Sequence, residues 1–151
     1  MNVTARADYA VRALLVLATA EAPPVKADVV AEAQGIPRHF LDNILADLRR
    51  AGLVITARGA DGGSRLARPA AEISLADVMR AIEGPLAAVR DVRPEALAYD
   101  APAQHLPDVW VAVRAALRSV LEEVTIADIA SGALPPAVTA RTTDPEAWRS
   151  H

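Results

Sequence analysis

The sequence predicts a mainly α-helical fold with one small β-hairpin, and three observations support this fold class. Of the 151 residues, 52% are apolar but only 3% are aromatic, a composition typical of close-packed helices rich in Ala and Leu. Four apolar residues recur at the spacing i, i+3, i+4 and i+7 and so share one face of a helix. They are Leu41, Ile44, Leu45 and Leu48. A short strand, a glycine-rich turn and a second strand follow, as in a winged helix-turn-helix.

Two predicted helices precede the one that carries these leucines. Residues 5–20 are apolar on nearly every side, which predicts a central helix, and Thr4 is a suitable N-terminal cap. This helix breaks at Pro23-Pro24. Residues 26–34 form the predicted first helix of the helix-turn-helix. The turn covers residues 35–37, and its proline begins the recognition helix.

The recognition helix is predicted to end at Gly52 and to present a polar face. At about 100° per residue, the side opposite the leucines carries His39, Asn43 and Arg50. Because the apolar side is fixed in a core, the polar side can be offered to a DNA groove.

Residues 53–56 and 64–67 are the predicted strands of a hairpin whose turn holds three glycines and an aspartate. Arg58 stands at the base of this turn, and the tip has almost no side chains. That arrangement suits insertion into a narrow minor groove, where the negative potential of DNA is strongest. The alternative is an ordinary hairpin with a solvated arginine.

The C-terminal half is predicted to supply a dimer interface. Ser74 and Asp77 cap a helix that ends at Gly84, and the loop 85–107 leads to a long helix over 108–123. This long helix has an apolar stripe and no following helix of similar length, so we expect it to pair with its copy. The predicted dimerisation residues are Val109, Trp110, Val113, Leu117, Val120, Leu121 and Val124.

A short helix and a tail are expected to follow. Thr125 and Asp128 cap the short helix, and the residues after Gly132 hold three prolines and little periodicity. The predicted organisation is a winged helix-turn-helix domain (1–84), a connecting loop (85–107), a dimerisation helix with the short terminal helix (108–131) and a mostly disordered tail (132–151).

The charge is divided unequally along the chain, whose net charge is −3. Residues 1–70 hold nine Lys or Arg and seven Asp or Glu, for a net +2, whereas residues 71–151 hold seven and twelve, for a net −5. Between residues 38 and 68, six arginines stand against three aspartates. The basic surface therefore lies on the recognition helix and the wing, as expected for contact with phosphates.

The first residues of the recognition helix are the candidate base readers, since the N-terminal residues of such helices reach base edges. Asn43 can read adenine, and Asp42 can accept a hydrogen bond from cytosine. Alternatively, Phe40 packs inward and Asp42 only balances nearby arginines. The candidate DNA-binding residues are Arg38, His39, Phe40, Asp42 and Asn43 on the helix, Arg58 in the wing, and Arg65 and Lys26 as phosphate contacts.

The combination of motifs resembles one bacterial family. The segments YAVRALLVLA (9–18) and LRRAGLV (48–54), the wing pattern RGxxGG (58–63) and the following LARPAAEISLADVMRAIEG (66–84) are similar to those of the Rrf-type winged-helix regulators. The resemblance covers residues 1–130. It implies a homodimeric transcription regulator, usually a repressor, that docks two recognition helices on a palindromic operator in double-stranded DNA. It also implies DNA contacts on the recognition helix at the positions named above.

This chain departs from that family in two features. Redox-sensing members hold an iron-sulfur cluster through three cysteines in the loop that corresponds to 85–107, and this chain has no cysteine. Asp8 stands at a position where some relatives supply a carboxylate ligand. Because clusters are held mainly by thiolates, Asp8 alone cannot hold one in a chain without cysteine. In the wing, Ser64 stands where relatives usually have an aromatic residue, which questions how the wing is anchored.

No cofactor or metal is therefore expected. The histidines, His39, His105 and His151, lie far apart and lack the spacing of zinc ligands. Because the resemblance implies a regulator and no cluster can form, we expect a small molecule or a protein to be the effector. The loop 85–107, where relatives hold their cluster, is its expected site of action.

An enzyme is not expected, because the chain has no phosphate-binding loop, no Ser-His or Cys-His set and no recognisable pair of catalytic carboxylates. The sequence favours a sequence-specific DNA-binding regulator. The alternative is a partner-controlled module in which the acidic half binds a protein and DNA binding is secondary. No apolar run reaches membrane length and no export signal is recognisable, so a cytoplasmic protein is expected.

Overall fold

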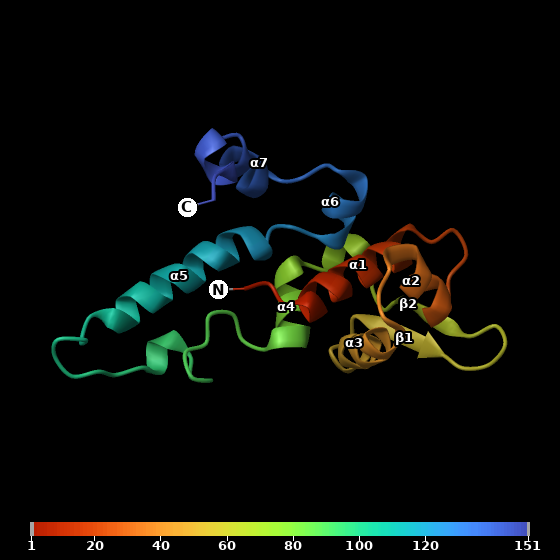
Figure 1. Cartoon of the computed structure of the whole chain (residues 1–151), viewed down its shortest axis with the longest axis horizontal. Coiled ribbons are helices and arrows are strands. Elements are labelled where there is room, and N and C mark those ends of the chain that lie inside the picture. Colours follow the sequence, from red (N-terminus) through yellow and green to blue (C-terminus); the bar gives the residue numbers. More distant parts are fainter. Residues whose placement is uncertain (1, 151) are drawn as a thin grey trace.

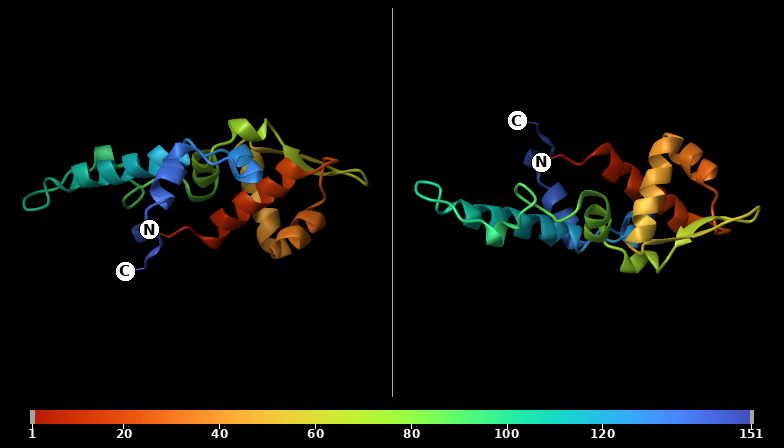
Figure 2. Two further views of the ribbon diagram at one scale, coloured as in Figure 1. Left: turned by 90° about the horizontal axis from the view of Figure 1, so that it is seen from above. Right: turned by 90° about the horizontal axis from the view of Figure 1, so that it is seen from below.

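The computed structural model describes residues 2–150, and His151 lies outside the described residues. The chain forms an elongated molecule (Figure 1). A β-hairpin projects from one end, and the loop that precedes the long helix lies at the other (Figure 2).

Residues 2–150 contain seven α-helices, two strands and three short 3-10 helices. The α-helices are α1 (Ala5–Thr19), α2 (Ala27–Gln34), α3 (Arg38–Arg50), α4 (Leu75–Glu83), α5 (Leu106–Leu121), α6 (Ile126–Ser131) and α7 (Pro136–Thr142). The strands are β1 (Val54–Ala57) and β2 (Gly63–Leu66), and the 3-10 helices are η1 (Ala70–Glu72), η2 (Pro94–Ala96) and η3 (Pro145–Trp148).

Helix α1 is the centre of the core, as its apolar sequence predicts. The side chains of Ala7, Ala10 and Ala13 are fully buried, and their small size lets neighbouring helices approach closely. Helices α2, α3, α4 and α6 all contact α1. At its start, Thr4 Oγ1 accepts a hydrogen bond of 3.2 Å from the Ala7 N–H, which confirms the predicted cap.

The recognition helix α3 has the predicted buried face. Leu41, Ile44 and Leu48 are fully buried, and α3 packs on α1 and α4. Gly35 ends α2 in the left-handed conformation, with a φ of 60°, and so turns the chain between the two helices. Pro37 is the residue before α3 rather than its first residue.

The wing is an antiparallel hairpin that is fastened to the start of α2. Thr56 pairs with Ser64 within the hairpin, and Ser64 also exchanges two backbone hydrogen bonds of 2.8 Å with Val25. Gly63 permits this contact, because its φ is 147° and a Cβ there would lie 2.5 Å from the Val25 carbonyl oxygen. Together α2, α3 and the hairpin form a winged helix-turn-helix, and the predicted fold class is confirmed.

Both predicted capping boxes are present. Ser74 and Asp77 each accept a hydrogen bond of 3.1 Å from the other's backbone N–H at the start of α4. Thr125 and Asp128 do the same at the start of α6, at 2.8 and 3.1 Å. The backbone N–H of Thr125 is the main cause of a lowered pKa of Asp128, and the Thr125 hydroxyl contributes.

After α5 the chain returns to the winged-helix core, which corrects the expectation for Val124. The Leu75 N–H donates to the Val124 carbonyl oxygen at 2.8 Å, and the Ile126 N–H donates to the Ile73 carbonyl oxygen at 2.9 Å. Helix α6 then packs on α1 and so forms part of the winged-helix core. Val124 is only 2% exposed, because it lies inside this chain, and it is not available to a second subunit.

The tail is also structured, in contrast to the disorder predicted for residues 132–151. Residues 136–142 form α7, which begins at a proline in the first helical turn and lies beside α5 (Figure 1). Arg141 Nη2 donates to Ser119 Oγ of α5 at 3.2 Å. Trp148 Nε1 donates to the Thr142 carbonyl oxygen at 2.8 Å, which ties η3 to α7.

Candidate nucleic-acid interface

The first turn of α3 carries an arginine that is held between two aspartates. Arg38 Nε lies 3.2 Å from Asp28 Oδ1 of α2, and Arg38 Nη1 lies 3.1 Å from Asp42 Oδ2 one turn along α3. All three side chains are at least 46% exposed, so these ion pairs are weak and are screened by salt. Asp42 therefore does balance an arginine, and Arg38 is free to exchange its carboxylate partners for a phosphate or a base.

Phe40 packs sideways instead of fully inward. Its ring meets Tyr9 of α1 edge-on, with centroids 6.1 Å apart, and its centroid lies 4.5 Å from that of His39. Phe40 remains 38% exposed, and His39 is exposed. The aromatic contact fixes the start of α3 against α1 and leaves part of the Phe40 ring accessible.

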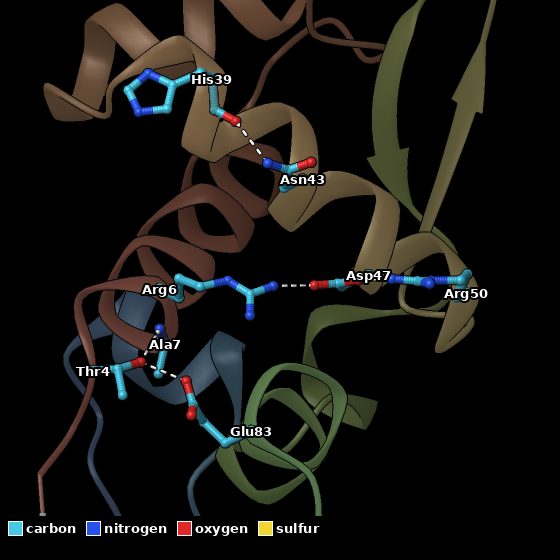
Figure 3. Close-up of polar contacts among 8 residues, drawn as sticks. All are labelled: Thr4, Arg6, Ala7, His39, Asn43, Asp47, Arg50 and Glu83. Atoms are coloured by element: carbon cyan, nitrogen blue, oxygen red, sulfur yellow. Dashed lines mark hydrogen bonds and ion pairs between the residues drawn. The ribbon is translucent and has the colours of Figure 1, made fainter.

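Asn43 lies on the exposed face of α3, one turn after His39. Its Nδ2 donates to the His39 carbonyl oxygen at 3.2 Å (Figure 3). Because this hydrogen bond is local and solvent-exposed, the amide can exchange it for an adenine edge at little net cost.

Asp47 ties the later part of α3 to α1. It forms ion pairs with Arg6 of α1 and with Arg50 of α3, and its own side chain is 14% exposed (Figure 3). At the same end of α1, the Thr4 hydroxyl donates to Glu83 of α4 (Figure 3). Arg50, which the sequence places on the polar face, pairs with Asp47 but is 74% exposed, so it remains accessible. The first half of α3 is the candidate base-reading surface, because the N-terminal residues of a recognition helix reach base edges.

A groove of about 500 Å³ separates α3 from the wing. Arg38, Asp42 and Arg49 line it from α3, Thr56 lines it from β1, and Lys26 lines it from the start of α2. Arg49 is not among the residues predicted from the sequence to bind DNA. Its spacing of seven residues from Asp42 is the signal that places it on the same helix face.

The basic residues predicted for the wing are exposed. Arg58 lies in the turn after β1, and Arg65 lies on β2. The backbone pairing between Val25 and Ser64 holds the wing next to Lys26, which is also exposed. Arg58, Arg65 and Lys26 therefore lie on the wing and on the segment paired with it, beside α3.

Ser64 anchors the wing through its hydroxyl and its backbone. It is 2% exposed, and its Oγ lies 3.3 Å from the Thr56 hydroxyl across the hairpin. Together with the Val25 pairing, this contact fixes the base of the wing without an aromatic ring.

The predicted dimerisation residues, Val124 excepted, lie on α5. Val109 and Val113 are 52% and 38% exposed, whereas Trp110, Leu117, Val120 and Leu121 are half-buried. No residue of α5 is fully buried. The exposed part of the stripe thus lies toward the start of α5, away from the winged-helix core.

The side chains present do not fit an iron-sulfur cluster. The chain has no cysteine, and residues 2–150 contain no group of three or more His, Cys, Asp or Glu that could hold a metal ion. Asp8 forms an ion pair of 3.0 Å with Arg12, and Glu95, in the loop before α5, forms one with Arg114. These carboxylates neutralise arginines, and no thiolate accompanies them.

An exposed recognition-helix N-terminus beside a basic wing defines a winged-helix DNA-binding protein. Residues 3–132 match the Rrf2 family, which is described as an iron-dependent transcriptional regulator. The chain therefore belongs to the Rrf2 family.

Relatives of known name and solved structures support this family membership. A Mycobacterium tuberculosis (strain H37Rv) protein, named as an HTH-type transcriptional regulator, is 56% identical over 136 residues, which cover 89% of this chain and 84% of that protein. CymR of Bacillus subtilis is 30% identical over 132 residues, 87% of this chain and 91% of CymR. The structure of B. subtilis CymR, the global cysteine regulator, gives a TM-score of 0.72 at 29% identity, covering 87% of this chain and 98% of that one. The structure of T. potens IscR gives a TM-score of 0.70 at 30% identity, and the match covers 100% of this chain and 93% of that one.

The protein is therefore a transcriptional regulator of a DNA-binding, non-enzymatic family. The comparisons do not favour the alternative of a protein-binding module in which DNA binding is secondary. Within residues 2–150, no helix has both the length and the apolar character needed to cross a membrane.

Proposed function

We propose that the protein is a homodimeric repressor that binds a palindromic operator without an iron-sulfur cluster. The observation that carries this proposal is the exposed first half of α3 beside the groove and the wing. Arg38 and Asn43 have only weak or local partners there. Arg58, Arg65 and Lys26 supply exposed positive charge on the wing side. Such a surface pairs base-edge readers with phosphate contacts. A cytoplasmic location, with access to DNA, follows from this role.

Dimerisation is proposed to occur through the apolar stripe of α5. Val109 and Val113 expose apolar surface that a second copy of α5 would remove from water. A two-fold dimer presents two recognition helices, and binding to one face of DNA requires them about 34 Å apart. The orientation of α5 relative to the winged-helix core would set this distance.

The signal is proposed to act through residues 85–107, which include most of the connection between α4 and α5 and the first residues of α5. A ligand or a protein that changes the arrangement of this connection would change the spacing of the two recognition helices. DNA would then be released without any contact between the effector and the DNA-binding surface.

A gel-shift experiment on the DNA upstream of the protein's own gene tests the proposal. We expect one retarded species whose formation survives excess random-sequence DNA and is lost when one half of the palindrome is scrambled. Transcription in vitro from the same promoter should fall as the protein is added. Equal binding to the upstream and the scrambled DNA would contradict the proposed function.

A further inference from the structure

A second basic site lies away from the DNA-binding surface. A hollow of about 430 Å³ between α4, the connecting segment and α5 is lined by Arg80, Arg93, Arg114 and Arg118. Glu95 is the only acidic residue among its lining residues, which also include the segment 84–86. Four arginines thus line one small space.

This concentration is unexpected in the acidic half of the chain. Residues 71–151 carry a net charge of −5 and only seven basic residues, and four of those seven line this hollow. They come from three separate segments: Arg80 from α4, Arg93 from the connection, and Arg114 and Arg118 from α5. The fold therefore gathers positive charge where the sequence as a whole is acidic.

Nearby carboxylates neutralise only part of this charge. Glu122 accepts hydrogen bonds from both Arg80 and Arg118, and Glu95 accepts one from Arg114. The hydrogen bond to Arg118 is the main cause of a lowered pKa of Glu122. Among the described residues Arg93 forms no ion pair, so four arginines stand against two glutamates, a local net charge of +2.

The arginines can be reached by a ligand. The side chains of Arg80, Arg114 and Arg118 are 42%, 22% and 53% exposed. Ion pairs with this exposure contribute little stability, so an incoming anion can replace the glutamates as partners. Guanidinium groups bind phosphate and carboxylate groups through paired N–H donors, which favours a small oxyanion with two or more negative charges.

We propose that this hollow binds a small polyvalent oxyanion, of phosphate or carboxylate type, as the effector of the regulator. The anion would bind Arg93 of the connection and bridge Arg80 of α4 to Arg114 and Arg118 of α5, and so fix α5 relative to the winged-helix core. The regulatory half of this inference rests on the proposed function, because it requires a dimer whose two recognition helices depend on that arrangement.

Calorimetric titration of the full-length protein tests the site without DNA. Inorganic pyrophosphate and citrate, at constant ionic strength with chloride as reference, distinguish a phosphate from a carboxylate ligand. At least one of them should bind with one site per chain, and Arg93→Gln and Arg114→Gln should each weaken its binding about tenfold or more. Arg90→Gln is the matched control: it removes the same charge three residues away, at a side chain that lies over Tyr99 and outside the hollow.

Anion binding and regulation by the anion are tested by different results. If neither probe binds, or if Arg93→Gln and Arg90→Gln have the same affinity as the wild type, the proposed site is wrong. Operator affinity is then measured with and without the probe. The same measurement on Arg93→Gln shows how much of any change arises because the anion competes with DNA for the DNA-binding surface. A change in the wild type that Arg93→Gln lacks supports regulation, and no such change overturns it. Failure of the proposed function would appear separately, as a lack of specific DNA binding without any probe.

Discussion

Replacing both Val109 and Val113 by Asp is expected to convert the protein into a monomer and to weaken operator binding about a hundredfold or more. Both valines are exposed on the same stripe of α5, and a charge on each would have to be desolvated in the dimer. A monomer can engage only one half-site, so it loses the gain that comes from linking two binding events. Light scattering gives the mass, and fluorescence anisotropy gives the affinity for the operator.

Val111→Asp is the matched control for this prediction. Val111 is 37% exposed on the same helix, but two residues from Val109 places it about 200° around the axis, on the opposite side. This variant should remain dimeric with unchanged DNA binding. A wild-type protein that is monomeric at micromolar concentration, or a dimeric double variant, would show that α5 is not the interface.

Substitutions on the helix and in the wing are expected to have different effects on DNA binding. Asn43→Ala should weaken binding to the operator by about 1–3 kcal/mol and leave binding to random DNA nearly unchanged, because it removes a base-edge reader. Arg58→Ala should weaken binding to both DNAs and reduce the dependence of affinity on salt, because it removes a positive charge at the groove. The affinities are measured on operator and random duplexes over a range of salt concentrations.

Arg149→Ala controls for the loss of a positive charge alone, since Arg149 is paired with Glu146 in the C-terminal segment, far along the chain from the wing. It should bind both DNAs like the wild type. If Asn43→Ala lost affinity equally for the operator and for random DNA, the N-terminal half of α3 would not be the base-reading surface.

The sequence predicts the winged-helix core well because its signals are local. The spacing of Leu41, Ile44 and Leu48 identifies the buried face of α3, and all three are fully buried. The two capping boxes are present at the starts of α4 and α6 as predicted. Each of these features depends on residues within one or two turns of each other, so no knowledge of the tertiary fold is needed.

The features that the sequence did not predict depend on contacts between distant segments. Val124 continues the helical spacing of the α5 stripe, but backbone pairing with Leu75 draws it into the core. The pairing of Val25 with Ser64 has no pattern in the sequence, because backbone groups of any residue can form it. The arginine hollow is likewise invisible until α4, the connection and α5 are brought together.

The protein is proposed to bind specific DNA as a dimer without an iron-sulfur cluster. The most direct test treats the purified protein with iron and sulfide under anaerobic conditions, and then measures iron content, visible absorbance and operator affinity before and after treatment. With no cysteine to supply thiolate ligands, the protein should stay colourless, and its operator affinity should not change. Stoichiometric iron with cluster absorbance, or operator binding that appears only after the treatment, would show that the protein holds or needs a cluster.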